Sequence, residues 1–98
     1  MNVFLAENVE YLLELGDKFQ IQFVMDVCEK FLQTTTEIQC IQKLVWADTY
    51  AFSNLHHACI QSLDSLNAFK RLKSHEEYRK ISDTTKAALY EKLIKLLP

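Results

Sequence analysis

The sequence has little of what a small β fold needs. Glycine and proline occur once each, as Gly16 and Pro98. A β-sandwich or barrel of 98 residues would need many more turn residues, so the composition favours helices joined by short polar links. A single glycine also excludes a glycine-rich phosphate-binding loop. No apolar run approaches the ~20 residues that a membrane-spanning helix needs, and we expect no membrane partner.

Cysteines are few and widely spaced, at Cys28, Cys40 and Cys59. Their number is odd and no CxxC pair occurs, so we interpret them as reduced thiols in the core of a cytoplasmic or nuclear protein. A metal site would need convergent ligands, but His56 and His57 are adjacent and point about 100° apart on a helix. We therefore expect neither a metal nor a cofactor.

Neither sign of charge predominates, and no catalytic arrangement is evident. Eleven basic and thirteen acidic residues leave a formal charge of -2, whereas a duplex nucleic-acid binder usually carries a basic surplus. His56 and Cys59 are neighbours on one helix, but no third orienting group accompanies them. We therefore expect no nucleic acid, no small-molecule substrate and no enzyme.

What the chain does contain is a repeat. Residues 16–28 and 47–59 follow one pattern at an offset of 31 residues. Each has a small residue, Asp, a spacer, an aromatic residue and then an apolar run at helical spacing. A period in this range is typical of stacked helical units that cannot bury their apolar faces alone. The repeat predicts two similar helical hairpins in a protein that binds other proteins.

The apolar spacing as a whole predicts an all-α fold of stacked antiparallel helical hairpins, with six or seven helices. Gly16 either ends the first helix or allows a close crossing with its neighbour. Residues 3–5 could form the stub of a strand. We expect helices capped by Asn8, by Thr35 or Thr36, and by Ser53, a second helix over about 21–32, short segments from Ala68 and Ser74, and a last helix from Ser82–Asp83.

Two acids and a tryptophan stand out at the repeat. Asp17 and Asp48 hold equivalent places, so we predict that each carboxylate accepts hydrogen bonds from backbone N–H groups where one helix ends and the next begins. Trp46 is either core filler or an exposed anchor for a partner.

The segment from Asn8 to Leu32 resembles the C-terminal helical pair of BTB/POZ domains. The shared pattern is a leucine-rich helix, a small residue, Asp and an aromatic, and then a helix with a Cys followed by Glu, here Cys28 and Glu29. The second copy resembles the 3-box or BACK-like helical extension of cullin adaptors, and the tail resembles nematode MATH–BTB proteins. This resemblance implies a BTB part over 1–33 and an extension over 34–98, the latter made of a hairpin over 37–65 and C-terminal helices over 66–98.

The resemblance implies a protein-interaction module of a substrate adaptor for a cullin–RING ubiquitin ligase, with the cullin as partner. The alternative is a purely structural helical linker or oligomerisation module. The strand-rich half of a BTB domain is missing, so we expect a fragment with Phe23, Met25 and Phe31 uncovered, which favours self-association. The implied apolar groove and its adjacent link comprise Thr35, Glu37, Ile41, Leu44, Val45, Trp46, Phe52 and Leu55.

Overall fold

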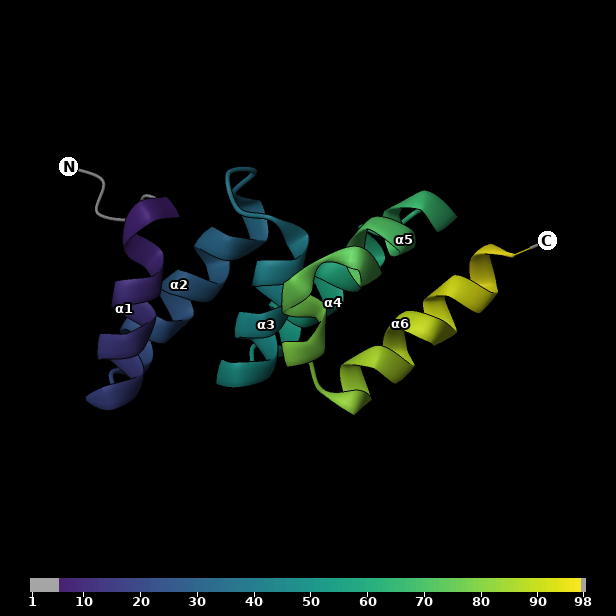
Figure 1. Cartoon of the computed structure of the whole chain (residues 1–98). Helices are drawn as coiled ribbons and strands as arrows, with labels where there is room; N and C mark the ends of the chain where they lie inside the picture. Colours follow the sequence, from purple (N-terminus) through teal and green to yellow (C-terminus); the bar gives the residue numbers. More distant parts are fainter. Residues whose placement is uncertain (1–5, 98) are drawn as a thin grey trace. The chain divides into compact units, whose positions relative to one another are not determined.

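The computed structural model describes residues 6–97 and divides the chain into two units, Met1–Ile38 and Gln39–Pro98. The described residues form six α-helices and one 3-10 helix, without any strand (Figure 1). The prediction of an all-α fold with six or seven helices is confirmed. The expected strand stub at residues 3–5 lies outside the described part of the chain. Within that part, no helix combines the length and the apolar character needed to cross a membrane.

The first unit is a pair of helices, α1 (Ala6–Lys18) and α2 (Gln22–Thr34). Asn8 lies inside α1 rather than at its cap, because α1 already includes Ala6 and Glu7. The pair buries side chains at helical spacing, so each helix contributes one apolar face. The most buried members are Val9, Leu13, Cys28 and Leu32, all 0% exposed.

Gly16 allows the two helices of the first unit to approach closely. It is buried and lies within α1, so it does not end the helix. A Cβ atom at this position would lie 2.7 Å from the Met25 sulfur and 3.1 Å from Cγ1 of Val24. Of the two roles considered for Gly16, the structure supports the close crossing.

The predicted repeat is also a repeat of backbone geometry. In both turns the N–H of the residue that caps the second helix donates to a carbonyl five positions earlier, near the end of the first helix. The two hairpins therefore have the same type of turn between their helices. The stacking of one hairpin on the other stays a prediction. The bonds join Ile21 N to Gly16 O at 2.8 Å and Phe52 N to Ala47 O at 2.9 Å.

The second unit contains the remaining helices, in which α3 packs on α4 and α6 contacts both α4 and α5. Its core is formed by apolar residues from every α-helix and from the links between them. The largest fully buried side chains there are Leu44, Leu55 and Thr85. The elements are α3 (Cys40–Tyr50), α4 (Ser53–Gln61), α5 (Leu66–Ser74), η1 (Glu76–Lys80) and α6 (Asp83–Leu96).

The helix starts differ in how well the sequence predicted them. The last helix starts at Ser82–Asp83 as predicted, and the hydroxyl of Ser82 caps α6 by accepting from the N–H of Thr85 at 3.2 Å. The predicted cap at Thr35 or Thr36 is wrong, since α3 begins only at Cys40. The hydroxyl of Thr35 instead accepts from the N–H of Glu37 at 3.3 Å, within the link. Ser53 is the first residue of α4 rather than its cap, which is Phe52.

Candidate protein-interaction surface

Half of the residues expected to line an apolar groove lie in the core of the second unit. Ile41 and Phe52 are 3% and 6% exposed, and Leu44 and Leu55 are 0% exposed. These side chains fix α3 to α4 and offer almost no surface to a partner. Their apolar side chains are used in the packing of the hairpin itself.

The other expected groove residues retain accessible surface. Val45 and Trp46 lie on α3 and are half-buried, so Trp46 both packs within the unit and presents part of its indole outward. In the first unit, the link after α2 holds Thr35, which is half-buried, and Glu37, which is exposed. These four positions are the members of the expected set that a partner could reach.

The first unit carries an exposed apolar patch near its turn. Phe19, Ile21 and Phe23 are 61%, 42% and 76% exposed. Phe23 is therefore uncovered, as expected, whereas Met25 is 8% exposed because it packs against α1 at Gly16. An exposed apolar patch of this kind is typical of a protein interaction site.

The carboxylate of Asp48, near the end of α3, is bound to the start of α6. Its Oδ2 accepts from the backbone N–H of Ser82 at 2.8 Å, and the hydroxyl of Thr85 donates to its Oδ1. Both donors, Ser82 and Thr85, belong to the start of α6 and not to the turn between α3 and α4 that follows Asp48. Asp17, the counterpart in the first unit, is exposed, and its backbone carbonyl accepts from the side-chain amide of Gln20 at 2.6 Å.

A histidine completes this cluster without making a catalytic relay. His56 Nε2 lies 2.7 Å from Oγ1 of Thr85 and 3.9 Å from Oδ1 of Asp48. Because the Thr85 hydroxyl donates to Asp48, its oxygen accepts from the ring N–H. A serine-hydrolase relay would place the acid on the other ring nitrogen and expose the nucleophile. Thr85 is only 1% exposed, so it is not placed as a nucleophile. The cluster instead joins three helices, because Asp48 lies on α3, His56 on α4 and Thr85 on α6.

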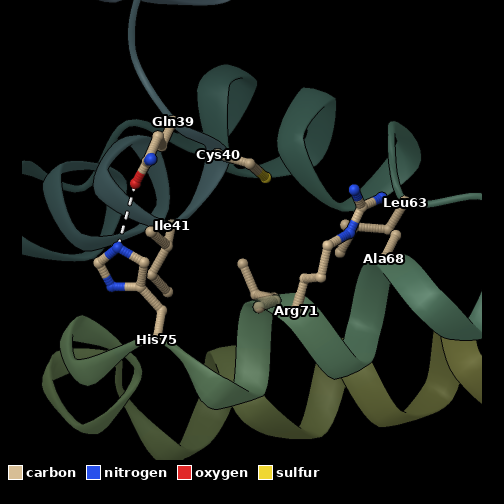
Figure 2. Close-up of a pocket in the computed structure, with 8 residues that line it drawn as sticks. Gln39, Cys40, Ile41, Leu63, Ala68, Arg71 and His75 are labelled. Carbon is tan, nitrogen blue, oxygen red and sulfur yellow. Dashed lines mark hydrogen bonds between the residues drawn. The ribbon is translucent and has the colours of Figure 1, made fainter.

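A hollow of about 360 Å³ opens between the start of α3 and the helix α5 (Figure 2). His75 closes one side, where its Nε2 lies 3.0 Å from Oε1 of Gln39. Nδ1 of His75 accepts from the N–H of Glu77 at 3.2 Å, so the neutral ring carries its proton on Nε2. The hollow is lined by Ile41, Leu63, Ala68 and Leu72, with Gln39, Cys40, Arg71 and His75 as its polar members.

Two of the three cysteines meet beside this hollow. All three are free; Cys28 and Cys59 are buried and Cys40 is half-buried. A hydrogen bond from Cys59, aided by Ser62 and Lys43 and opposed by burial, lowers the pKa of Cys40 to about 7. The same bond, together with burial, raises the pKa of Cys59. Burial raises the pKa of Cys28 to about 11.

The sequence did not reveal this thiol pair. The cap expected at Thr35 or Thr36 placed Cys40 about one turn inside a helix rather than at its start, and Cys59 was considered as a neighbour of His56. In the structure His56 is hydrogen-bonded to Thr85, while the thiol of Cys40 is hydrogen-bonded to the carbonyl of Cys59. No group of three His, Cys, Asp or Glu side chains in residues 6–97 is arranged to hold a metal ion.

The fold and these surfaces define an all-helical module with apolar and half-buried positions available to a protein partner. Residues 1–36 match the BTB/POZ domain family. The chain is 48% identical to BTB and MATH domain-containing protein 38 of Caenorhabditis elegans over 92 residues, which cover 94% of this chain and 24% of that protein. The resemblance to BTB/POZ and MATH–BTB proteins is thereby confirmed.

Other relatives extend the same pattern. The chain is 37% identical over 92 residues to BTB and MATH domain-containing protein 36 of Caenorhabditis elegans, covering 94% of this chain and 29% of the relative. It is 34% identical over 74 residues to Kelch-like protein 24 of Homo sapiens, covering 74% and 12%. The chain thus spans about a quarter of the nematode relatives it matches. No solved structure gave a significant match.

Proposed function

We propose that the chain is a protein-interaction module of a substrate adaptor for a cullin–RING E3 ubiquitin ligase. In the family that the sequence resembles, the BTB domain and its helical extension dock on the cullin, while a separate MATH domain recruits the substrate. The observation that carries the proposal is the similarity to MATH–BTB relatives over 92 residues, which continues far beyond the 36 residues matched as BTB domain.

The adaptor would act by proximity rather than by chemistry of its own. Holding a substrate near the ligase raises the effective concentration of the substrate at the ubiquitin donor. No catalytic residue is needed for that role. A cullin partner would also place the protein in the cytoplasm or the nucleus.

We propose that residues 1–33 are the BTB part and 34–98 the helical extension. In the extension, the buried residues of α3 and α4 hold the hairpin in shape, and the side chains with free surface contact the cullin. Trp46 is the first candidate, because a half-buried tryptophan on a rigid helix can anchor a partner with little loss of conformational entropy. Val45 lies beside it in the sequence, and Thr35 and Glu37 are separate candidates in the link.

Titration of the 98-residue chain with a cullin N-terminal domain, followed by calorimetry, tests the proposal. We expect measurable binding and a loss of about tenfold or more in affinity for Trp46→Ala, the usual scale for an interface hot spot. Ile94→Ala is the matched control, because Ile94 is an apolar residue of the same unit that is 67% exposed and lies outside the proposed surface. No binding by the folded chain would overturn the proposal.

The alternative function is a structural helical linker or oligomerisation module. The burial of Ile41, Leu44 and Leu55 favours it, because these residues are fully used inside the fold. In that case the chain would not bind a cullin, and sedimentation would show monomers in equilibrium with larger species. Phe23→Ser would then shift the equilibrium toward monomers, since Phe23 is the most exposed aromatic residue among those described.

A further inference from the structure

Cys40 occupies a position that favours the ionised thiol. It is the first residue of α3, where unpaired backbone N–H groups and the helix dipole stabilise negative charge. It is half-buried and lines the hollow beside α5. Figure 2 shows Cys40 on α3 and Arg71 on α5, two helices that border the same hollow.

The second thiol lies where it can act on the first. The thiol of Cys40 donates to the backbone carbonyl of Cys59 at 3.9 Å, and the Cys59 side chain is close enough to shift the pKa of Cys40. The groups that set the charge of Cys40 come from both neighbouring elements. Lys43 lies on α3, while Ser62 follows α4 and also donates to the Cys59 carbonyl at 2.7 Å.

We propose that Cys40 is a peroxide-reactive cysteine and that Cys59 is its resolving partner, so that a hydroperoxide converts the pair into a disulfide between α3 and α4. The geometry that carries this is the approach of a half-buried thiol at the start of α3 to within 3.9 Å of the backbone of Cys59, the residue that bears the second, buried thiol. The reaction does not depend on the cullin partner proposed above.

The reaction balances in two steps. The Cys40 thiolate attacks the distal oxygen of hydrogen peroxide, the O–O bond breaks, and the product is a sulfenic acid with release of hydroxide, which takes up a proton to give water. The Cys59 thiol gives up its proton, its sulfur attacks the Cys40 sulfur, and the hydroxyl leaves as a second water. Two thiols are oxidised and one peroxide is reduced to two waters.

Each cysteine has a distinct expected behaviour. Cys40 should ionise near neutral pH, with a pKa of about 7, whereas the buried Cys28 has a pKa of about 11. At pH 7 the Cys40 thiolate fraction should therefore make alkylation of Cys40 at least about tenfold faster than that of Cys28. Cys28 is thus an internal control present in the same chain.

The test treats the reduced, folded 98-residue chain with hydrogen peroxide and maps its peptides by mass spectrometry. We expect a disulfide joining the Cys40 and Cys59 peptides, with Cys28 remaining a free thiol. In Cys59→Ser the disulfide should vanish, and dimedone should trap a sulfenic acid at Cys40. Equal labelling of Cys28 and Cys40, or no disulfide between the pair, would overturn the proposal.

A second measurement distinguishes positioning by Cys59 from simple exposure of Cys40. The rate of iodoacetamide alkylation of Cys40 is followed against pH. Cys59→Ser retains a hydroxyl that can donate, so the midpoint should stay near that of an acidic thiol. Cys59→Ala removes the donor, and alkylation at pH 7 should slow by about tenfold. Identical pH profiles for the two variants, with native circular dichroism, would contradict the role of Cys59.

Discussion

Gln20 and Ala51 lie 31 residues apart and share a left-handed backbone conformation, with φ angles of 54° and 58°. They are the two residues with positive φ among those that the structure describes. Each stands one position before the residue that caps the next helix. The repeat in the sequence therefore specifies a repeated turn in the backbone as well as a repeated apolar pattern.

Ala51→Gly should stabilise the chain. A left-handed conformation costs an ordinary residue about 1–2 kcal/mol, whereas glycine adopts it freely but loses about 0.5–1 kcal/mol more conformational entropy on folding. We expect a gain of up to about 1 kcal/mol in the free energy of unfolding, measured with urea.

The control for this substitution is the same change in a helix interior. Ala87 is exposed within α6, where Ala→Gly should cost about 1 kcal/mol. Gln20→Gly should gain less than Ala51→Gly, because it removes the amide that donates to the Asp17 carbonyl at 2.6 Å. A loss of stability in Ala51→Gly would contradict the assigned turn geometry.

Gly16→Val should destabilise the first helix pair. The branched side chain would collide with Met25 and Val24, because even a Cβ would lie 2.7 Å and 3.1 Å from their nearest atoms. Overpacking of a close helix crossing costs about 1–3 kcal/mol. Thermal unfolding followed by circular dichroism measures the change.

Gly16→Ala separates backbone from packing effects at the same position. Alanine gains helix propensity of about 1 kcal/mol, and the sulfur it meets belongs to a flexible side chain that can move. We therefore expect Gly16→Ala to change stability much less than Gly16→Val. A valine variant as stable as the parent chain would show that the helices are not closely packed at this point.

The sequence predicted the fold well because helical periodicity is encoded locally. The pattern of Val24, Cys28 and Leu32 suffices to place α2 to within two residues at each end. The predicted start of α3 was wrong. Thr35 and Thr36 are favourable caps by residue type, but the link extends to Gln39 and the helix begins at Cys40. Local preference for a cap does not decide how much link the packing of a hairpin needs.

The candidate surface was less predictable, because exposure depends on tertiary packing. Phe52 and Leu55 are as apolar as a groove would require, but the fold uses them in its core. The pairing of Cys40 with Cys59, and of Asp48 with Ser82, joins residues that lie far apart in the sequence. A correct prediction that α3 begins at Cys40 would have been the local signal that this thiol lies at a helix N-terminus.

Asp48→Asn should destabilise the chain, because the acid accepts two hydrogen bonds at the start of α6. Hydrogen bonds to a charged group contribute about 1.5–3 kcal/mol, and asparagine can replace the acceptor only in part. We expect a loss of about 1–2 kcal/mol, measured by urea unfolding. Asp17→Asn is the matched control in the equivalent turn, where the side chain is exposed, and should change stability by less than about 0.5 kcal/mol. Equal losses in the two variants would contradict the particular role of Asp48.

Tyr78 should ionise at a higher pH than an ordinary tyrosine. Burial, followed by its hydrogen bond with Tyr90, raises the pKa of Tyr78 from 10 to about 12. The pKa of Tyr78 is higher in the folded chain than in the unfolded chain, so the neutral phenol contributes to stability. This contribution is complete below pH 10 and is lost as the pH rises through about 12. Alkaline titration followed by phenolate absorbance should lose a transition near pH 12 in Tyr78→Phe. Tyr11→Phe, which removes a phenol that is 64% exposed, should keep that transition, and the reverse result would place the shifted tyrosine elsewhere.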